Sequence, residues 1–219
     1  MFNYKGVIFD LDGTLLDSMN IWEQIDNKFL SKRNISVPDD YMNSIAHLSA
    51  YDTALYTIER FNLNDTPETL INEWIQMALE DYPKVNLKPG VEEYINFLVK
   101  NRIKISIASS TEPIILKTAI KNRFFYKYID AALTTTDVKR GKEHPDIYIK
   151  CAAAMEVHPS ECVVFEDIFT ALQTAKSCGF ITVGIYDKYS SQDKDKLIKT
   201  ADKFIYSFKE MIPPLNHAE

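Results

Sequence analysis

Two aspartates separated by one residue follow the first apolar run of the chain, residues 4–9. Side chains two apart on an extended strand point the same way, so Asp10 and Asp12 are predicted to lie together at the end of a buried strand. Two like charges at such a place are costly unless a cation, a shared proton or a catalytic role compensates. The simpler alternative is a turn before Gly13. A calcium-binding EF-hand loop is disfavoured, because Leu15 stands where that loop needs glycine.

Hydroxyl groups and a lysine occur at two later junctions, each of which precedes a predicted helix. The apolar run 103–108 ends in Ser109, Ser110 and Thr111, just before a predicted helix start. Hydroxyls and free backbone N–H groups at such a place can bind an anion, although helix capping alone also explains them. Lys142 lies in the loop before the predicted helix 146–155. Taken alone, that lysine would be interpreted as a solvated surface charge.

A second acidic pair, Glu166 and Asp167, follows the apolar run 162–165. By itself this pair could simply favour the first turn of the next helix. Together, however, the four junctions supply carboxylates, hydroxyls, a lysine and again carboxylates. Carboxylates that bind a hard divalent cation, facing a lysine and hydroxyls that bind an anion, are expected of a phosphoryl-transfer site.

The elements that position these residues alternate along most of the chain. Predicted strands cover residues 4–9, 103–108, 131–133, 162–165, 180–185 and 203–206, with helices between the later ones. This alternation predicts an α/β fold, a Rossmann-like parallel sheet with helices on both faces. Ligands bind such sheets beyond the carboxyl ends of the strands, where the polar pairs stand.

The segment 17–83 shows helical periodicity instead and is predicted to be an all-helical cap domain. The α/β core domain then consists of residues 1–16 and 84–219. Apolar faces at helical spacing are Ile21, Trp22, Ile25 and Phe29, then Tyr51, Leu55 and Ile58, then Leu70, Trp74 and Met77.

Composition narrows the functional classes. The 219 residues are 46% hydrophobic and 26% charged, as in globular proteins, and the net charge is −6. This sign excludes a general nucleic-acid binder and a polybasic membrane-binding protein. Three cysteines without a CxxC pair indicate reduced thiols, and no apolar run approaches the roughly 20 residues of a membrane helix. We therefore expect a cytoplasmic protein, monomeric or weakly homodimeric.

The segment from Asp10 to Ser18 resembles the first motif of the haloacid dehalogenase superfamily. Ser109 resembles its second motif, Lys142 its third and the acidic pair 166–167 its fourth. Order and spacing agree over nearly the whole chain. The helical insert resembles the cap of the β-phosphoglucomutase-like and phosphoglycolate-phosphatase-like branch.

This resemblance implies roles for the acidic residues. Asp10 would be the nucleophile that forms an aspartyl phosphate, and Asp12 would protonate the leaving oxygen and then activate water. Mg²⁺ would be the cofactor. Its ligands would be the Asp10 carboxylate, the Asp12 backbone carbonyl and Asp167, with Glu166 in or beside its coordination shell.

The resemblance likewise implies that Ser109, the Ser110 backbone N–H and Lys142 hold the phosphoryl oxygens. Three positions depart from the family pattern. Relatives usually carry serine and glycine where Ile168 and Ala171 stand, and often proline where Glu143 stands.

A phosphatase acting on a small phosphorylated metabolite is the first interpretation. A phosphosugar mutase is the second, although Ala50 occupies the position of the mutase cap arginine. A non-catalytic phosphate-binding protein is the third. Trp22, His47 and Ser49 are the cap side chains expected to contact the substrate. Because the cap carries twelve acidic and four basic residues, a monophosphate with a neutral or cationic remainder is expected.

Overall fold

The computed structural model describes residues 4–214, which contain a six-stranded, fully parallel sheet of order β3-β2-β1-β4-β5-β6. The predicted α/β class is thereby confirmed. The strands are β1 Gly6–Phe9, β2 Lys104–Ser109, β3 Ala131–Thr134, β4 Cys162–Glu166, β5 Ile181–Ile185 and β6 Lys203–Ile205. Strand β1 lies between β2 and β4, so the later strands are added first on one side of β1 and then on the other. The carboxyl end of β1 is therefore at a topological switch point.

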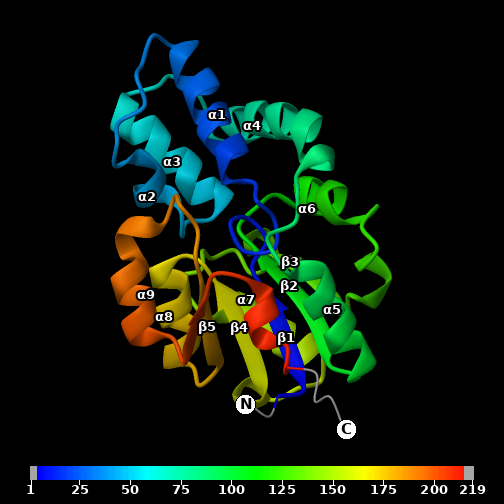
Figure 1. Cartoon of the computed structure of the whole chain (residues 1–219). Coiled ribbons are helices and arrows are strands. Elements are labelled where there is room, and N and C mark those ends of the chain that lie inside the picture. The colour runs from blue at the N-terminus through cyan, green and yellow to red at the C-terminus, as the bar shows by residue number, and fades with distance from the viewer. Residues whose placement is uncertain (1–3, 215–219) are drawn as a thin grey trace, which may run out of the picture.

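Helices cover both faces of the sheet (Figure 1). They are α5 Val91–Lys100, α6 Pro113–Ile120, α7 Asp146–Ala154, α8 Phe169–Ser177 and α9 Lys194–Thr200, the last of which the sequence patterns did not predict. Successive residues of β1 serve different faces, because side chains alternate along a strand. Val7 and Phe9 belong to the core cluster that includes α5, whereas Ile8 packs in the cluster formed with α7.

The cap is built from four helices, α1 Met19–Ser31, α2 Tyr41–Ile45, α3 Ala50–Phe61 and α4 Pro67–Asp81. They gather above the carboxyl ends of the strands (Figure 1). The face predicted for α3 is wrong. Tyr51 and Leu55 are 50% and 44% exposed, while Ala54 and Thr57 are buried. The hydroxyl of Thr57 lies 2.7 Å from that of the buried Tyr41, which orients this helix by a polar contact.

Two antiparallel linkers join the cap to the sheet. Leu16 forms a β-bridge with Leu87, and the Asp17 N–H donates to the Asn86 carbonyl at 3.0 Å. The short 3₁₀ helix η1, Tyr82–Lys84, ends the cap. Both crossings are therefore held side by side next to the carboxyl end of β1.

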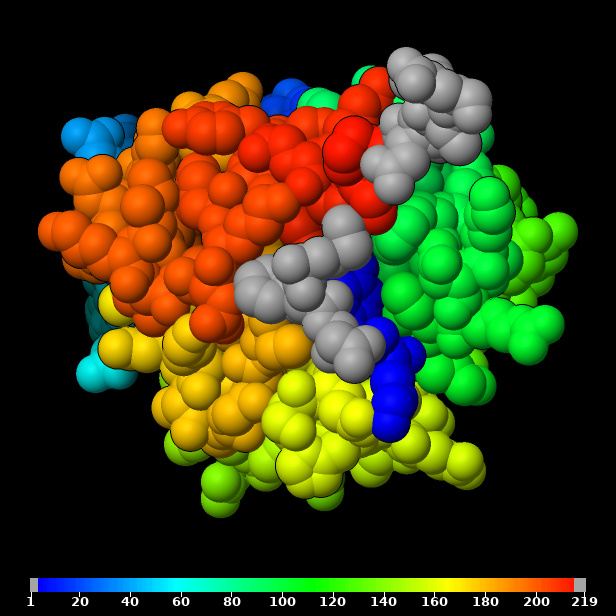
Figure 2. Space-filling model, turned by 60° about the horizontal axis from the view of Figure 1, so that its bottom comes forward, coloured from blue at the N-terminus to red at the C-terminus, as the bar shows by residue number. Residues whose placement is uncertain are grey.

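The face opposite the cap brings distant segments together. In Figure 2 the beginning of β1, in blue, lies between the green surface of α5 and the yellow surface near residue 160. The Lys5 N–H donates to the Glu161 carbonyl at 2.9 Å across this seam. Among residues 4–214, no helix combines the length and apolar character needed to cross a bilayer.

Candidate active site

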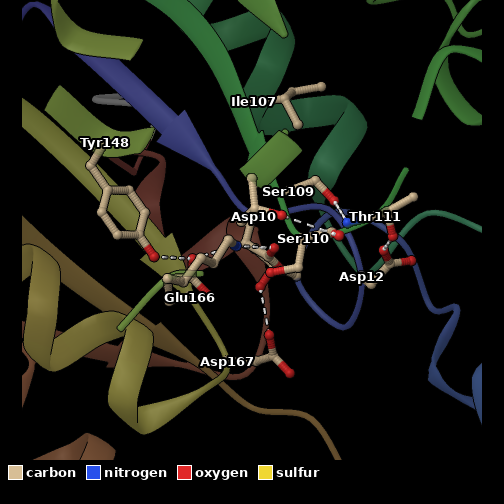
Figure 3. Close-up of polar contacts among 12 residues, drawn as sticks. Asp10, Asp12, Ile107, Ser109, Ser110, Thr111, Tyr148, Glu166 and Asp167 are labelled. Atoms are coloured by element: carbon tan, nitrogen blue, oxygen red, sulfur yellow. Dashed lines mark hydrogen bonds and ion pairs between the residues drawn. The ribbon is translucent and has the colours of Figure 1, made fainter. Parts of the chain in front are cut away.

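Side chains from three neighbouring strands meet at the carboxyl edge of the sheet (Figure 3). Asp10 directly follows the central strand β1. Ser109 is the last residue of β2, and Glu166 is the last residue of β4. Parallel pairing of β1 with both neighbours aligns the three ends, so residues 57 to 156 positions apart in sequence converge. This is the convergence that the sequence predicted.

An acidic cluster forms the floor of the site. One carboxylate oxygen each from Asp10, Glu166 and Asp167 lies within 4.8 Å of the others. Glu166 Oε2 and Asp167 Oδ2 are buried and have no hydrogen-bond partner in the described chain. Oxygen ligands of this kind suit a hard divalent cation, so the residues fit the Mg²⁺ expected from the sequence.

Burial disfavours ionisation of the carboxyl groups in this cluster when no cation is bound. Loss of water, together with the neighbouring carboxylates, raises the pKa of Asp10 to about 8 even though Lys142 acts in the opposite direction. Burial also raises the pKa values of Glu166 and Asp167. A cation in the cluster would replace the missing solvation of the charged forms.

Lys142 reaches this cluster from the loop before α7. Its ammonium group contacts the carboxylate of Asp10 and donates to Glu166 Oε1 at 2.7 Å. Burial alone would lower the pKa of this lysine, but the two carboxylates raise it overall, so the side chain is a cation. Tyr148, on α7, donates its hydroxyl to the same Glu166 oxygen at 2.7 Å and fixes it from the other side.

The turn after β1 allows close approach to the acidic pair 166–167. Gly13 has a φ of +80°, and a Cβ atom there would overlap the carboxylate of Asp167. Thr14 donates its hydroxyl to Asp167 Oδ1 at 3.1 Å. The glycine is thus required both for its left-handed backbone and for the space it leaves.

Asp12 lies beside Thr111, away from Glu166 (Figure 3). Its side chain is outside the acidic cluster, so only its backbone remains a candidate metal ligand. Three hydroxyls hold the carboxylate: Ser18 Oγ at 2.5 Å, Thr111 Oγ1 at 2.7 Å, and the phenol of Tyr82. Because Ser18 and Tyr82 come from the two linkers, the position of Asp12 depends on both crossings between cap and core.

The serines at the end of β2 differ in their surroundings. Ser109 accepts a hydrogen bond from the Thr111 N–H at 3.0 Å, which tightens the turn. Ser110 Oγ is buried without a partner in the described chain, and Ser110 lines the cavity beneath the cap. Free donor capacity at this point is consistent with the phosphate-binding role expected of the segment.

A cavity of about 160 Å³ separates cap and core. Its core wall contains Asp10, Asp12, Ser110, Lys142 and Glu166. Its cap wall is mostly apolar. The cap residues are Met19, Trp22, Asp26, Met42, Ile45, Ala46, Leu48, Ala50, Thr53, Ile71, Trp74 and Ile75. The polar core wall therefore faces a largely apolar cap wall.

The expected cap contacts are distributed unequally. Trp22 lines the cavity, and its ring packs edge-on against Tyr82 at 5.9 Å between centroids. Ser49 is occupied in capping α3, where it donates to Asp52 Oδ2 at 2.5 Å and accepts from the Asp52 N–H. His47 contributes its backbone, because its carbonyl accepts from the Lys142 N–H at 3.0 Å. Neither Ser49 nor His47 is part of the cavity wall.

Two departures from the family pattern have visible consequences. Ile168 lines the cavity and adds apolar surface next to the acidic pair. Glu143 turns back over Gly141, where a Cβ atom would overlap its carboxylate, and it does not line the cavity. The carboxylate of Glu143 is therefore not part of the cavity wall to which Lys142 contributes.

Sequence reasoning missed three polar residues of the site, Tyr82, Tyr148 and Asp26, and expected Thr111 only as part of the hydroxyl segment at the end of β2. Thr111, Tyr82 and Tyr148 each donate a hydroxyl hydrogen bond to a carboxylate of the site. Asp26 lines the cap wall, and burial raises its pKa to about 7. Asp26 could have been noticed in the sequence, because it is a charged residue on the otherwise apolar helical face that contains Trp22 and Phe29.

Fold and site together define a class of α/β enzymes in which a helical cap covers carboxylates at the end of a parallel sheet. A family model for haloacid dehalogenase-like hydrolases matches residues 7–185. The chain belongs to this family, as its motifs predicted.

Characterised relatives cover most of this chain. Validoxylamine A 7'-phosphate phosphatase of Streptomyces hygroscopicus subsp. limoneus is 26% identical, over 90% of this chain and 93% of its own. β-Phosphoglucomutase of Bacillus subtilis is 29% identical, over 83% of each chain. CbbY from Rhodobacter sphaeroides, solved with xylulose-(1,5)bisphosphate, shares the fold with a TM-score of 0.82 at 18% identity, covering 94% of this chain and 96% of that one.

Proposed function

We propose that the protein is a Mg²⁺-dependent phosphatase that hydrolyses a small phosphate monoester through an aspartyl phosphate on Asp10. The observation that carries the proposal is the buried cluster of three carboxylates beside the Lys142 ammonium group, open to a cavity under the cap. The phosphatase named among the relatives supports the same class of reaction.

In the first step, an Asp10 carboxylate oxygen attacks phosphorus and the bond from phosphorus to the alcohol oxygen breaks. Asp12 gives its proton to that oxygen, so the alcohol leaves neutral. Lys142 and the Ser110 segment bind the phosphoryl oxygens. Attack by an anion on an anion requires such positive groups to hold the reactants together.

In the second step, Asp12 takes a proton from water, and the water oxygen attacks phosphorus. The bond between phosphorus and Asp10 breaks, inorganic phosphate is released, and the Asp10 carboxylate is restored. The hydroxyls of Ser18, Thr111 and Tyr82 orient Asp12 for both proton transfers.

Asp10, Glu166 and Asp167 are the side chains that would hold Mg²⁺, with the Asp12 carbonyl as a further oxygen ligand. When bound, the ion supplies charge neutralisation and polarises the phosphoryl group. Thr14 positions Asp167 for this task through its 3.1 Å hydrogen bond. Tyr148 positions Glu166 in the same way.

The decisive experiment measures turnover of 4-nitrophenyl phosphate with Mg²⁺, after chelation, and after Mg²⁺ is restored. Asp10→Asn should abolish turnover, because an amide forms no aspartyl phosphate. Asp12→Asn should slow turnover by about 10²–10⁴, the usual contribution of general acid–base catalysis. Activity that survives chelation would refute the metal assignment, and an active Asp10→Asn variant would refute the covalent step.

Mutase activity is the alternative, suggested by the β-phosphoglucomutase relative. A mutase must also hold a second phosphate. Of the described residues that line the cavity, Lys142 is the basic one, and the apolar Ala50 lies in the cap wall. A panel of sugar phosphates with a bisphosphate activator tests this, and efficient isomerisation would overturn the phosphatase assignment.

A further inference from the structure

The cap wall of the cavity holds one acidic side chain, Asp26, and apart from Thr53 its other side chains are apolar. On α1, Met19, Trp22 and Asp26 follow one another at spacings of three and four residues, so they share one helical face. All three line the cavity. The helix packed against α1, α4, contributes Ile71, Trp74 and Ile75 to the same wall. Asp26 therefore stands where an apolar side chain would complete the wall.

Asp26 is a buried residue, and its carboxylate has no partner among the described residues. The residue is only 6% exposed, and its side chain forms no hydrogen bond or ion pair with the described residues. Every other acid on the cavity wall with comparable burial has a partner: Lys142 meets Asp10 and Glu166. Trp74 Nε1, on the same cap wall, is a buried polar atom without a partner among the described residues.

We propose that Asp26 binds an ammonium group on the alcohol portion of the substrate, so that the substrate is the phosphate monoester of a small amino alcohol. This inference rests on the proposed phosphatase function and specifies its substrate class. The phosphoryl group would bind at the acidic cluster and Lys142. The carbon skeleton would pack against Trp22 and Ile71, with its ammonium group at Asp26.

Charge and size both favour this class. An unpaired carboxylate in an apolar wall is costly, and a cation is the partner that compensates most fully. A second phosphate or a carboxylate on the substrate would instead be repelled by Asp26. An engineered cavity of about 150 Å³ holds benzene. The cavity of about 160 Å³ has a similar volume, so it has room for a small, ring-sized carbon skeleton.

The test uses three phosphate esters of the same size, whose aryl groups carry a 4-aminomethyl, a 4-hydroxymethyl or a 4-ethyl substituent. For the wild-type protein, kcat/KM should be about 10- to 100-fold higher for the aminomethyl ester than for the hydroxymethyl ester, as expected for a hydrogen bond to a charged group. In Asp26→Asn this preference should fall to about threefold or less. The amide keeps the size and hydrogen-bonding capacity of the side chain but removes its charge.

Asp39→Asn is the matched control, because Asp39 is an exposed cap aspartate without a side-chain hydrogen bond or ion pair among the described residues. It removes the same charge from the cap surface and should leave the preference unchanged. An equal loss in both variants would show a diffuse field of the acidic cap and overturn the assignment to Asp26.

Hydrolysis of 4-nitrophenyl phosphate separates this inference from the proposed function. If that ester is hydrolysed but the aminomethyl ester has no advantage, the inference fails and the phosphatase stands. If no ester is hydrolysed, calorimetric binding of the aminomethyl ester to Asp10→Asn and to the double variant Asp10→Asn/Asp26→Asn still decides. A loss of affinity of about tenfold or more in the double variant supports the ammonium site, and equal affinities refute it.

Discussion

Replacing Asp26 by asparagine should stabilise the ligand-free protein, and the gain should grow with pH. Burial raises the pKa of Asp26 from its ordinary value near 3.8 to about 7. The folded protein therefore keeps a proton that the unfolded chain releases above about pH 4. As pH rises from about 4 to about 7, ionisation of this carboxyl group progressively destabilises the folded state. An asparagine cannot ionise and avoids that loss.

The pKa difference sets the size of the effect. Each pKa unit corresponds to about 1.4 kcal/mol, so the full loss is about 4 kcal/mol and is reached above about pH 8. About half of it is present at pH 5.5, and little remains at pH 4. Relaxation of the cap around the charge would reduce these values, so we expect a gain of about 2–4 kcal/mol at pH 8.5.

The assay is urea unfolding of the wild type, Asp26→Asn and the control Asp39→Asn, at several pH values between 4.5 and 8.5 with a chelator present. Tyr41 is the titratable neighbour within electrostatic reach of Asp26, and burial keeps its phenol neutral over this range. The difference between Asp26→Asn and the wild type should widen steadily with pH, whereas Asp39→Asn should track the wild type. A difference that does not change with pH would refute the reasoning, because it would show that the carboxylate ionises in the folded state as freely as in the unfolded chain.

Three further outcomes are expected. Tyr82→Phe should lower kcat by about tenfold or more while inorganic phosphate binds unchanged, because Asp12 loses a hydrogen bond to its charged form; an unchanged kcat would remove Tyr82 from the proton-transfer apparatus. Gly13→Ala should raise the Mg²⁺ concentration needed for half-maximal rate, because the new Cβ displaces Asp167. Gly179→Ala is the control, because Gly179 has a φ of +83° and no atom lies within 4 Å of the added Cβ. This control should lose only about 1–2 kcal/mol of stability through backbone strain. Equal Mg²⁺ requirements in the two variants would contradict the overlap argument. Mg²⁺ affinity, measured by calorimetry, should rise with pH up to about 8, and binding should release protons. The reason is that the clustered carboxyl groups have raised pKa values and must ionise to bind the ion. An affinity that does not change with pH would contradict the burial of these groups.

Much of the candidate site could be predicted from local sequence, because its residues directly follow strands. A buried strand is recognisable as a short apolar run, and a parallel sheet brings the carboxyl ends of its strands to one edge. Asp10, Ser109 and Glu166 needed no further information to be placed together. The family motifs added Lys142, whose loop has no strand of its own to mark it.

The tertiary structure decided which groups surround those residues. Tyr148 reaches Glu166 because α7 packs against β1 and β2, and Tyr82 reaches Asp12 because the second linker returns beside the first. These contacts span 18 and 70 residues in sequence, and no periodicity in the chain records them. Likewise, the exposure of Tyr51 follows from how α3 docks, which hydrophobic spacing alone cannot specify.

The sequence by itself thus determined the sheet, the helical segment over it and the acidic residues at the strand ends, since these depend on local pattern and on the rules of parallel strands. Only the folded chain could show that the carboxylate of Asp26 lies in an apolar wall without a partner. Solvation is the physical reason. The energy of a charged group depends on everything packed around it, and that environment is assembled from helices distant in sequence.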